Sequence, residues 1–115
     1  MKKNPNIFLE HILDSILLIE EYSEGYSQAE FFKNRSLQDA IIRRLEIIGE
    51  AVKNLPAPFK AKHSDIPWKK IAGMRDILIH EYFDVDLALT WRVVKQELSP
   101  IRDYLIIVLN DLANG

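Results

Sequence analysis

The sequence predicts an all-α fold, an up-and-down bundle of four to five main helices. Apolar residues recur with a helical period of about 3.6 along the chain, and no segment shows the strict apolar–polar alternation of a strand. Helix-start signals such as Asn4 followed by Pro5 precede the periodic segments. With 115 residues, 48% hydrophobic and 28% charged, the chain can bury one core. We therefore expect a single helical domain over residues 1–115.

Two helices can be placed in the N-terminal half. The first is predicted from Pro5 to about Tyr22 and ends before Gly25, and the capping box SQAE opens a short helical turn after it. The second is predicted from Ser36 to just before Pro56, and apolar or small residues cover more than half of its circumference. Such a helix is either central in the bundle or contacts a second subunit.

The C-terminal half begins with a loop over residues 56–68 that holds three prolines. A third helix is predicted to start near residues 65–67 and to carry the segment MRDILIHEYF. Asp84 and Asp86 are N-cap candidates for a fourth helix. A serine before Pro100 predicts a break or kink there, followed by a last helical segment.

The charge distribution bears on possible partners. A net charge of −2 and a pI of about 5.9 argue against a generally basic protein that coats nucleic acid. Basic side chains nevertheless gather between Phe59 and Arg75, whereas the segment from Glu10 to Glu30 has six acidic residues and no lysine or arginine. These charges indicate either one locally positive face or solvated charges on separate helices.

The absence of cysteine excludes disulfides and thiolate metal sites and fits a reducing compartment. The apolar stretch after the basic start is interrupted by Glu10, His11 and Asp14, too early for a secretory signal or a membrane span. We expect a cytoplasmic protein with no membrane contact.

The segment MRDILIHEYF places charged and polar side chains among apolar residues, where each needs a partner or a use. Arg75 and His80 lie about 140° apart on an ideal helix and cannot converge on one small ligand. Either the helix loosens near Ile79, or a second copy of the chain supplies one of the two. Asp76 and His80, four residues apart, could touch within a helix, which would orient the imidazole.

Read as RxxxxHxY, Arg75, His80 and Tyr82 resemble the signature of the HepT-type toxins in the HEPN superfamily of helical ribonucleases. The resemblance extends over DAIIRRLEIIGEAVKNL, IPWKKIAGMRDILIHEYF and VDLALTWRVVKQELSPI, in the order expected for that family. It implies a homodimer that cleaves RNA without a metal or other cofactor. Arg75 and His80 would be catalytic, and Asp76 would be the supporting polar residue that follows the arginine. It also implies a toxin–antitoxin partner, a minimal nucleotidyltransferase that attaches AMP to the motif tyrosine, here Tyr82.

The implied chemistry suits these residues. Attack of a ribose 2′-OH on the adjacent phosphate needs a proton shuttle, and histidine titrates near neutrality. The transition state gains negative charge, which the fixed fork of arginine N–H donors can stabilise. Because each chain supplies one motif histidine, a two-fold axis would provide both an acid and a base. We expect the dimer to form through the second helix, where a monomer would leave Ile42, Leu45 and Gly49 exposed to water.

Several assignments stay open or favour structural roles. Tyr82 lies beside Ile71 and Leu78 on an ideal wheel, which favours a core tyrosine, whereas the resemblance favours an exposed one. His11 and His63 lack metal-ligand spacing and suit surface or capping positions, and no metal site is expected.

Trp68 and Trp91 suit the core better than base stacking, and Glu46 and Glu50 suit a solvated face or partners for Arg43 or Arg44. The alternative function is a non-catalytic helical module that binds a nucleotide or docks a nucleotidyltransferase.

Overall fold

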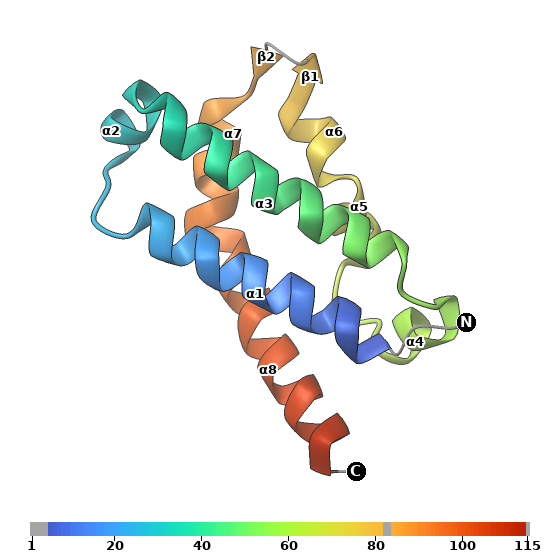
Figure 1. Cartoon of the computed structure of the whole chain (residues 1–115). Helices are drawn as coiled ribbons and strands as arrows, with labels where there is room; N and C mark the ends of the chain where they lie inside the picture. Colours follow the sequence, from blue (N-terminus) through green and yellow to red (C-terminus); the bar gives the residue numbers. More distant parts are fainter. Residues whose placement is uncertain (1–4, 82–83, 115) are drawn as a thin grey trace.

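The computed structural model describes residues 5–81 and 84–114, with the backbone alone described at residues 80 and 81. The chain is mostly helical, and the predicted all-α class is confirmed (Figure 1). The described strands, β1 and β2, form a short antiparallel ribbon. The elements in order are α1 (Pro5–Ser23), α2 (Gln28–Lys33), α3 (Arg35–Lys53), α4 (Ala57–Lys62), α5 (Trp68–Ala72), α6 (Met74–Leu78), β1 (Ile79–Glu81), β2 (Asp84–Val85), α7 (Leu87–Arg92), a π-helical segment (Val93–Glu97) and α8 (Leu98–Asn114).

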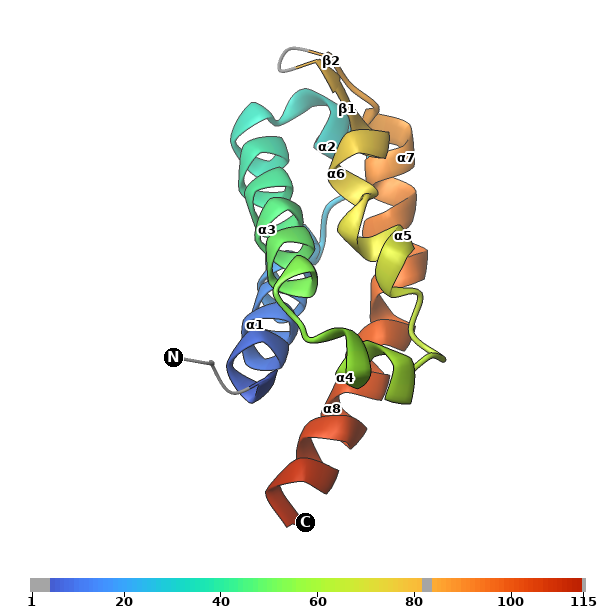
Figure 2. The same cartoon turned by 90° about the vertical axis from the view of Figure 1, so that its right-hand side faces the viewer.

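The bundle has two layers. Helices α1 and α3 run antiparallel side by side, and α5, α6, α7 and α8 form the second layer (Figures 1 and 2). Side chains between the layers make one continuous apolar core, because the helical stripes of both layers face each other. The last turns of α8 extend beyond the rest of the bundle (Figure 2). None of the described helices is long and apolar enough to cross a membrane.

The N-terminal helices follow the sequence signals. α1 ends at Ser23, and Gly25 adopts a positive φ of 81°, the left-handed conformation that glycine tolerates best. The predicted capping box is present, with Ser27 and Glu30 each bonded to the other's backbone N–H. These bonds favour the ionised carboxylate and lower the pKa of Glu30. α3 begins one residue before the predicted start, because Asn34 caps it.

The predicted third helix is divided into two short helices and an extended strand. α5 ends at Gly73, whose φ and ψ of −89° and 0° depart from regular helix geometry, and α6 ends at Leu78. Ile79 is extended and pairs with Val85, and the N–H of Asp86 donates to the carbonyl of Leu78 at 2.7 Å. A single helix through this segment was therefore wrong, whereas the loosening near Ile79 is confirmed.

The fourth helix has one of its two predicted caps. Asp86 accepts a hydrogen bond from the N–H of Leu89, whereas Asp84 lies in β2. The break predicted at Pro100 is absent, and α8 continues through it. The π-helical turns immediately before it widen the helix and rearrange its hydrogen bonds, which lets the helix accept a residue without an N–H.

Candidate functional site

Arg75 lies in the first turn of α6 and points to α3. Its Nε donates to Oε2 of Glu46 at 3.2 Å, and its Nη1 lies 3.6 Å from Oδ1 of Asp76. The Arg75 side chain is 48% exposed. Within the described residues, no partner contacts its Nη2. The guanidinium is thus held on one side and open to solvent on the other.

Glu46 has a different partner from the predicted ones. The sequence favours a solvated side chain or a contact with Arg43 or Arg44 for Glu46; its side chain is 35% exposed, but its ion-pair partner is Arg75, so the predicted partners are wrong. Arg75 is 29 residues further along the chain. Spacing along one helix identifies neighbours within that helix, so it could not show that α6 would lie beside Glu46.

Close contact between α3 and α5 sets the site's scaffold. A Cβ at Gly49 would lie 3.4 Å from the carbonyl oxygen of Ala72, so the small residue lets the two backbones approach. On the same face of α3, Leu45 is 2% exposed and Ile42 is half-buried. The premise that a monomer would leave Ile42, Leu45 and Gly49 exposed to water is wrong, because other parts of the same chain cover them. α3 is instead the central helix, the other predicted possibility.

His80 lies in β1, directly beyond the end of α6. Because α6 ends at Leu78, the helical four-residue contact expected between Asp76 and His80 does not apply. The Asp76 side chain is 79% exposed and pairs with Arg75. The His80 side chain lies outside the described atoms. Tyr82 lies outside the described residues, so the structure does not distinguish a core tyrosine from an exposed one.

A groove of about 480 Å³ opens beside Arg75. Residues of α1, α3, α5 and α6 line the groove, and α3 lies between α1 and the segment of α5 and α6 (Figure 1). The lining includes the basic side chains Arg43, Lys53 and Arg75 and the acidic side chains Glu46 and Glu50. Within the described part of the chain, Arg43 and Lys53 have no ion-pair partner. The groove therefore offers cations to an anionic ligand next to Arg75.

α1 contributes Phe8 and His11 to the same groove. His11 is exposed, as the predicted surface position requires. Nothing in the sequence signalled that it would share a groove with Arg75, because the two belong to helices on opposite sides of α3.

The basic residues between Phe59 and Arg75 do not form one uniform positive face. Lys70 pairs with Glu97 at 2.7 Å, and Arg75 pairs with Glu46. Lys60 donates to the carbonyl of Val52 at 3.5 Å. Lys62 and Lys69 are exposed. The run is therefore divided among several helices, and part of its charge is neutralised locally.

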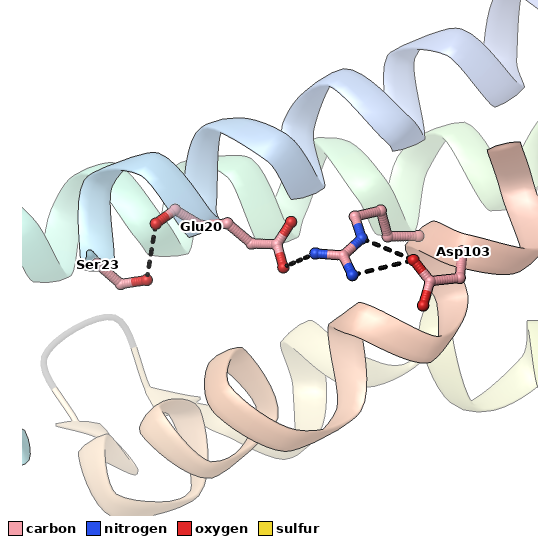
Figure 3. A network of polar contacts seen from close by, with 4 residues as sticks. Glu20, Ser23 and Asp103 are labelled. Carbon is pink, nitrogen blue, oxygen red and sulfur yellow. Dashed lines mark hydrogen bonds and ion pairs between the residues drawn. The ribbon is translucent and has the colours of Figure 1, made fainter. Parts of the chain in front are cut away.

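Other polar groups stabilise the bundle at a distance from the groove. The guanidinium of Arg102 binds Glu20 of α1 at 2.6 Å and its neighbour Asp103 at 2.9 Å, which ties α8 to α1 (Figure 3). The hydrogen bonds that Arg102 donates to Asp103 and Glu20 raise the pKa of Arg102. This network is structural, since it joins two helices.

The tryptophans and His63 have structural roles. Trp68 is buried in the core as predicted, and its Nε1 donates to the carbonyls of Lys60 and His63. His63 is the predicted cap, here at the C-terminus of α4. Trp91 stacks on Phe31 with ring centroids 4.9 Å apart. Over the described part of the chain, no three His, Asp or Glu side chains gather closely enough to hold a metal ion.

Comparison with known proteins identifies one family. The profile of the family described as Ribonuclease HepT-like matches residues 12–108. No solved structure matches the chain significantly. A Methanocaldococcus jannaschii protein, named as a gamma-glutamylcyclotransferase and candidate RNase, is 52% identical over 112 residues, which cover 97% of this chain and 50% of that protein. The chain thus spans half the length of this relative.

Two shorter relatives are covered almost fully. A candidate RNase of Caldanaerobacter subterraneus subsp. tengcongensis is 51% identical over 99 residues, which cover 86% of this chain and 88% of the relative. A protein of Thermococcus cleftensis, named as a probable ribonuclease HepT, is 44% identical over 102 residues, which cover 89% of this chain and 93% of the relative. The chain belongs to the HepT-like ribonuclease family.

Proposed function

We propose that the chain is an endoribonuclease toxin that cleaves RNA with Arg75 and His80 and without a metal ion. The observation that carries the proposal is the half-exposed guanidinium of Arg75 at the edge of a groove, with His80 directly beyond the same helix. Family membership and the RNase names of the relatives support the same class of reaction.

The end of α6 supports a joint role for the two residues. On a continuous helix they would diverge by about 140°. The extended backbone from Ile79 onward removes that constraint, so His80 need not follow the helical direction. This favours the prediction that the helix loosens over the prediction that a second copy supplies one of the two residues.

In the proposed reaction, a histidine accepts the proton of a ribose 2′-OH, whose oxygen then forms a bond to the adjacent phosphorus. The bond from phosphorus to the 5′-oxygen breaks, and a protonated histidine returns a proton to that oxygen. Arg75 donates hydrogen bonds to the phosphate oxygens, where negative charge grows in the transition state. A homodimer would bring two motif histidines together as base and acid, and light scattering should therefore give twice the monomer mass.

The groove gives the RNA a path to Arg75. Arg43 and Lys53 line it without ion-pair partners among the described residues, so they can neutralise phosphates that flank the scissile one. Glu50 lies in the same lining, so the binding should be local and modest, in keeping with the net charge of −2.

The proposed antitoxin is a minimal nucleotidyltransferase that attaches AMP to Tyr82. The tyrosine follows His80 by two residues, so a nucleotide attached there would lie close in sequence to the proposed catalytic histidine. Its phosphodiester would add negative charge, which repels an RNA backbone and can engage Arg75.

The decisive experiment is a cleavage assay on purified tRNA and mRNA with EDTA present. The unaltered chain should cleave RNA, and Arg75→Ala and His80→Ala should reduce the cleavage rate to background. The melting temperatures of both variants should stay close to that of the unaltered chain. Arg35→Ala is the matched control, because Arg35 is an 85% exposed arginine that pairs with Asp39 on α3. Activity that requires added Mg²⁺ contradicts the mechanism. Nucleotide binding without cleavage favours the alternative, a non-catalytic module.

A further inference from the structure

The ion pair between Glu46 and Arg75 connects two parts of the chain that are 29 residues apart. Asp76 also lies near the guanidinium, at 3.6 Å, but it is the sequence neighbour of Arg75 and is 79% exposed. Glu46 belongs to the central helix α3, which the core holds firmly: its neighbours Leu45 and Ile48 are 2% and 1% exposed. The ion pair with Glu46 therefore fixes the orientation of the Arg75 side chain relative to the rest of the fold.

This pair contributes little to stability. The two side chains are 48% and 35% exposed, and water screens the attraction between exposed charges. Apolar contacts already hold α6 on the bundle, since Met74 and Leu78 are 5% and 1% exposed. What the pair does fix is the orientation of one long, otherwise mobile side chain.

We propose that Glu46 is a positioning residue for Arg75, an inference that rests on the proposed RNA cleavage. Arginine presents five N–H donors in one rigid plane, so a bond at Nε fixes the plane of the whole group. The bond leaves Nη2 without a hydrogen-bond or ion-pair partner among the described residues, and Arg75 lines the groove in which a ligand would lie. A phosphate then meets donors that are already oriented, which lowers the entropic cost of reaching the transition state.

The test compares kcat and KM for RNA cleavage. Glu46→Ala should lower kcat on the order of tenfold with KM within about twofold, because orientation matters most at the reacting phosphate. The kcat of Glu46→Gln should lie between those of the unaltered chain and Glu46→Ala, since the glutamine amide oxygen can still accept a hydrogen bond from Nε of Arg75. Asp39→Ala is the matched control, because it removes another exposed carboxylate that pairs with an arginine on α3, and it should leave both constants unchanged.

A double variant separates positioning from a general charge effect. Arg75→Lys removes the planar fork, so adding Glu46→Ala to it should cause no further loss. A further tenfold loss of kcat when Glu46→Ala is added to Arg75→Lys contradicts the inference. So does a loss of kcat in Asp39→Ala equal to that in Glu46→Ala. A Glu46→Ala variant with unchanged or higher kcat also contradicts it, and a higher value would mean that Glu46 competes with the phosphate. Absence of cleavage by the unaltered chain contradicts the proposed function instead.

Discussion

Gly49 of α3 and Ala72 of α5 hold the two helices in backbone contact, with only 3.4 Å between the carbonyl oxygen of Ala72 and the place of a Cβ at position 49. The contact lies one helical turn beyond Glu46 on α3 and a few residues before Arg75 on the facing segment. The distance between the Glu46 and Arg75 side chains therefore depends on a small residue at position 49.

Gly49→Leu should separate α3 from α5 and weaken both stability and the Glu46–Arg75 contact. Overpacking of this kind costs about 1–3 kcal/mol, which urea unfolding would measure, and RNA cleavage should fall in the same variant. Gly49→Ala is the matched control. Its Cβ meets Ala72 at ordinary contact distance, and alanine favours the helix by about 1 kcal/mol, so stability should be kept or slightly raised. Full activity in the leucine variant would contradict this account.

Arg43 and Lys53 should contribute to RNA affinity and leave the chemical step intact. Each single alanine variant should raise KM severalfold at low salt with kcat unchanged, because these residues line the groove away from the reacting phosphate. The slope of log affinity against log salt should become shallower by about 0.7 for each removed phosphate contact to a single strand. Fluorescence anisotropy with labelled RNA at several salt concentrations measures the affinity and its salt slope. Unchanged affinity and slope in both variants would place the RNA elsewhere.

Arg75→Ala and His80→Ala should not restore each other's activity when they are mixed. The extended backbone after Leu78 favours a site in which Arg75 and His80 of one chain act on the same phosphate, with the histidine of the second copy as the other proton carrier, so each mixed dimer would lack part of every site. If instead each site needed only one arginine from one copy and one histidine from the other, mixed dimers would keep one intact site. Equal mixing would then recover about a quarter of the activity, on the statistics of random two-fold pairing. Recovery of that size after subunit exchange would contradict the within-chain arrangement.

The predictable part of this fold rests on local signals. Apolar periodicity and caps gave α1 to within a residue of its end and identified the capping box at Ser27 and the cap at Asp86. Such signals act over a few residues, so the sequence alone is enough to find them. The loosened helix near Ile79 was one of two predicted ways for Arg75 and His80 to face one ligand, the other being a second copy that supplies one of them.

The unpredicted part depends on which elements pack together. The apolar arc of α3 was visible in the sequence, but the sequence did not tell whether α5 or a second subunit covers it. Likewise, Glu46 and Arg75 carry no shared local pattern, since their contact exists only because α6 lies on α3. The division of the third helix at Gly73 was missed because one glycine inside a helical pattern is usually tolerated.

Tyr82→Phe should keep RNA cleavage and toxicity but escape neutralisation by the nucleotidyltransferase. The phenol oxygen is the proposed acceptor of AMP, and its removal leaves the rest of the ring and the neighbouring His80 unchanged. AMP transfer forms a bond from the tyrosine oxygen to the α-phosphorus of ATP, releases pyrophosphate and transfers the phenol proton to solvent or a base. Because the attached phosphodiester is negatively charged, it would compete with RNA for Arg75. Intact-mass spectrometry after co-expression should show added AMP on the unaltered chain and none on the phenylalanine variant. Tyr104→Phe, a half-buried tyrosine on α8, is the matched control and should be modified and neutralised normally. Full neutralisation of Tyr82→Phe, or AMP on another residue, would assign Tyr82 to the core, as the helical wheel alone suggested.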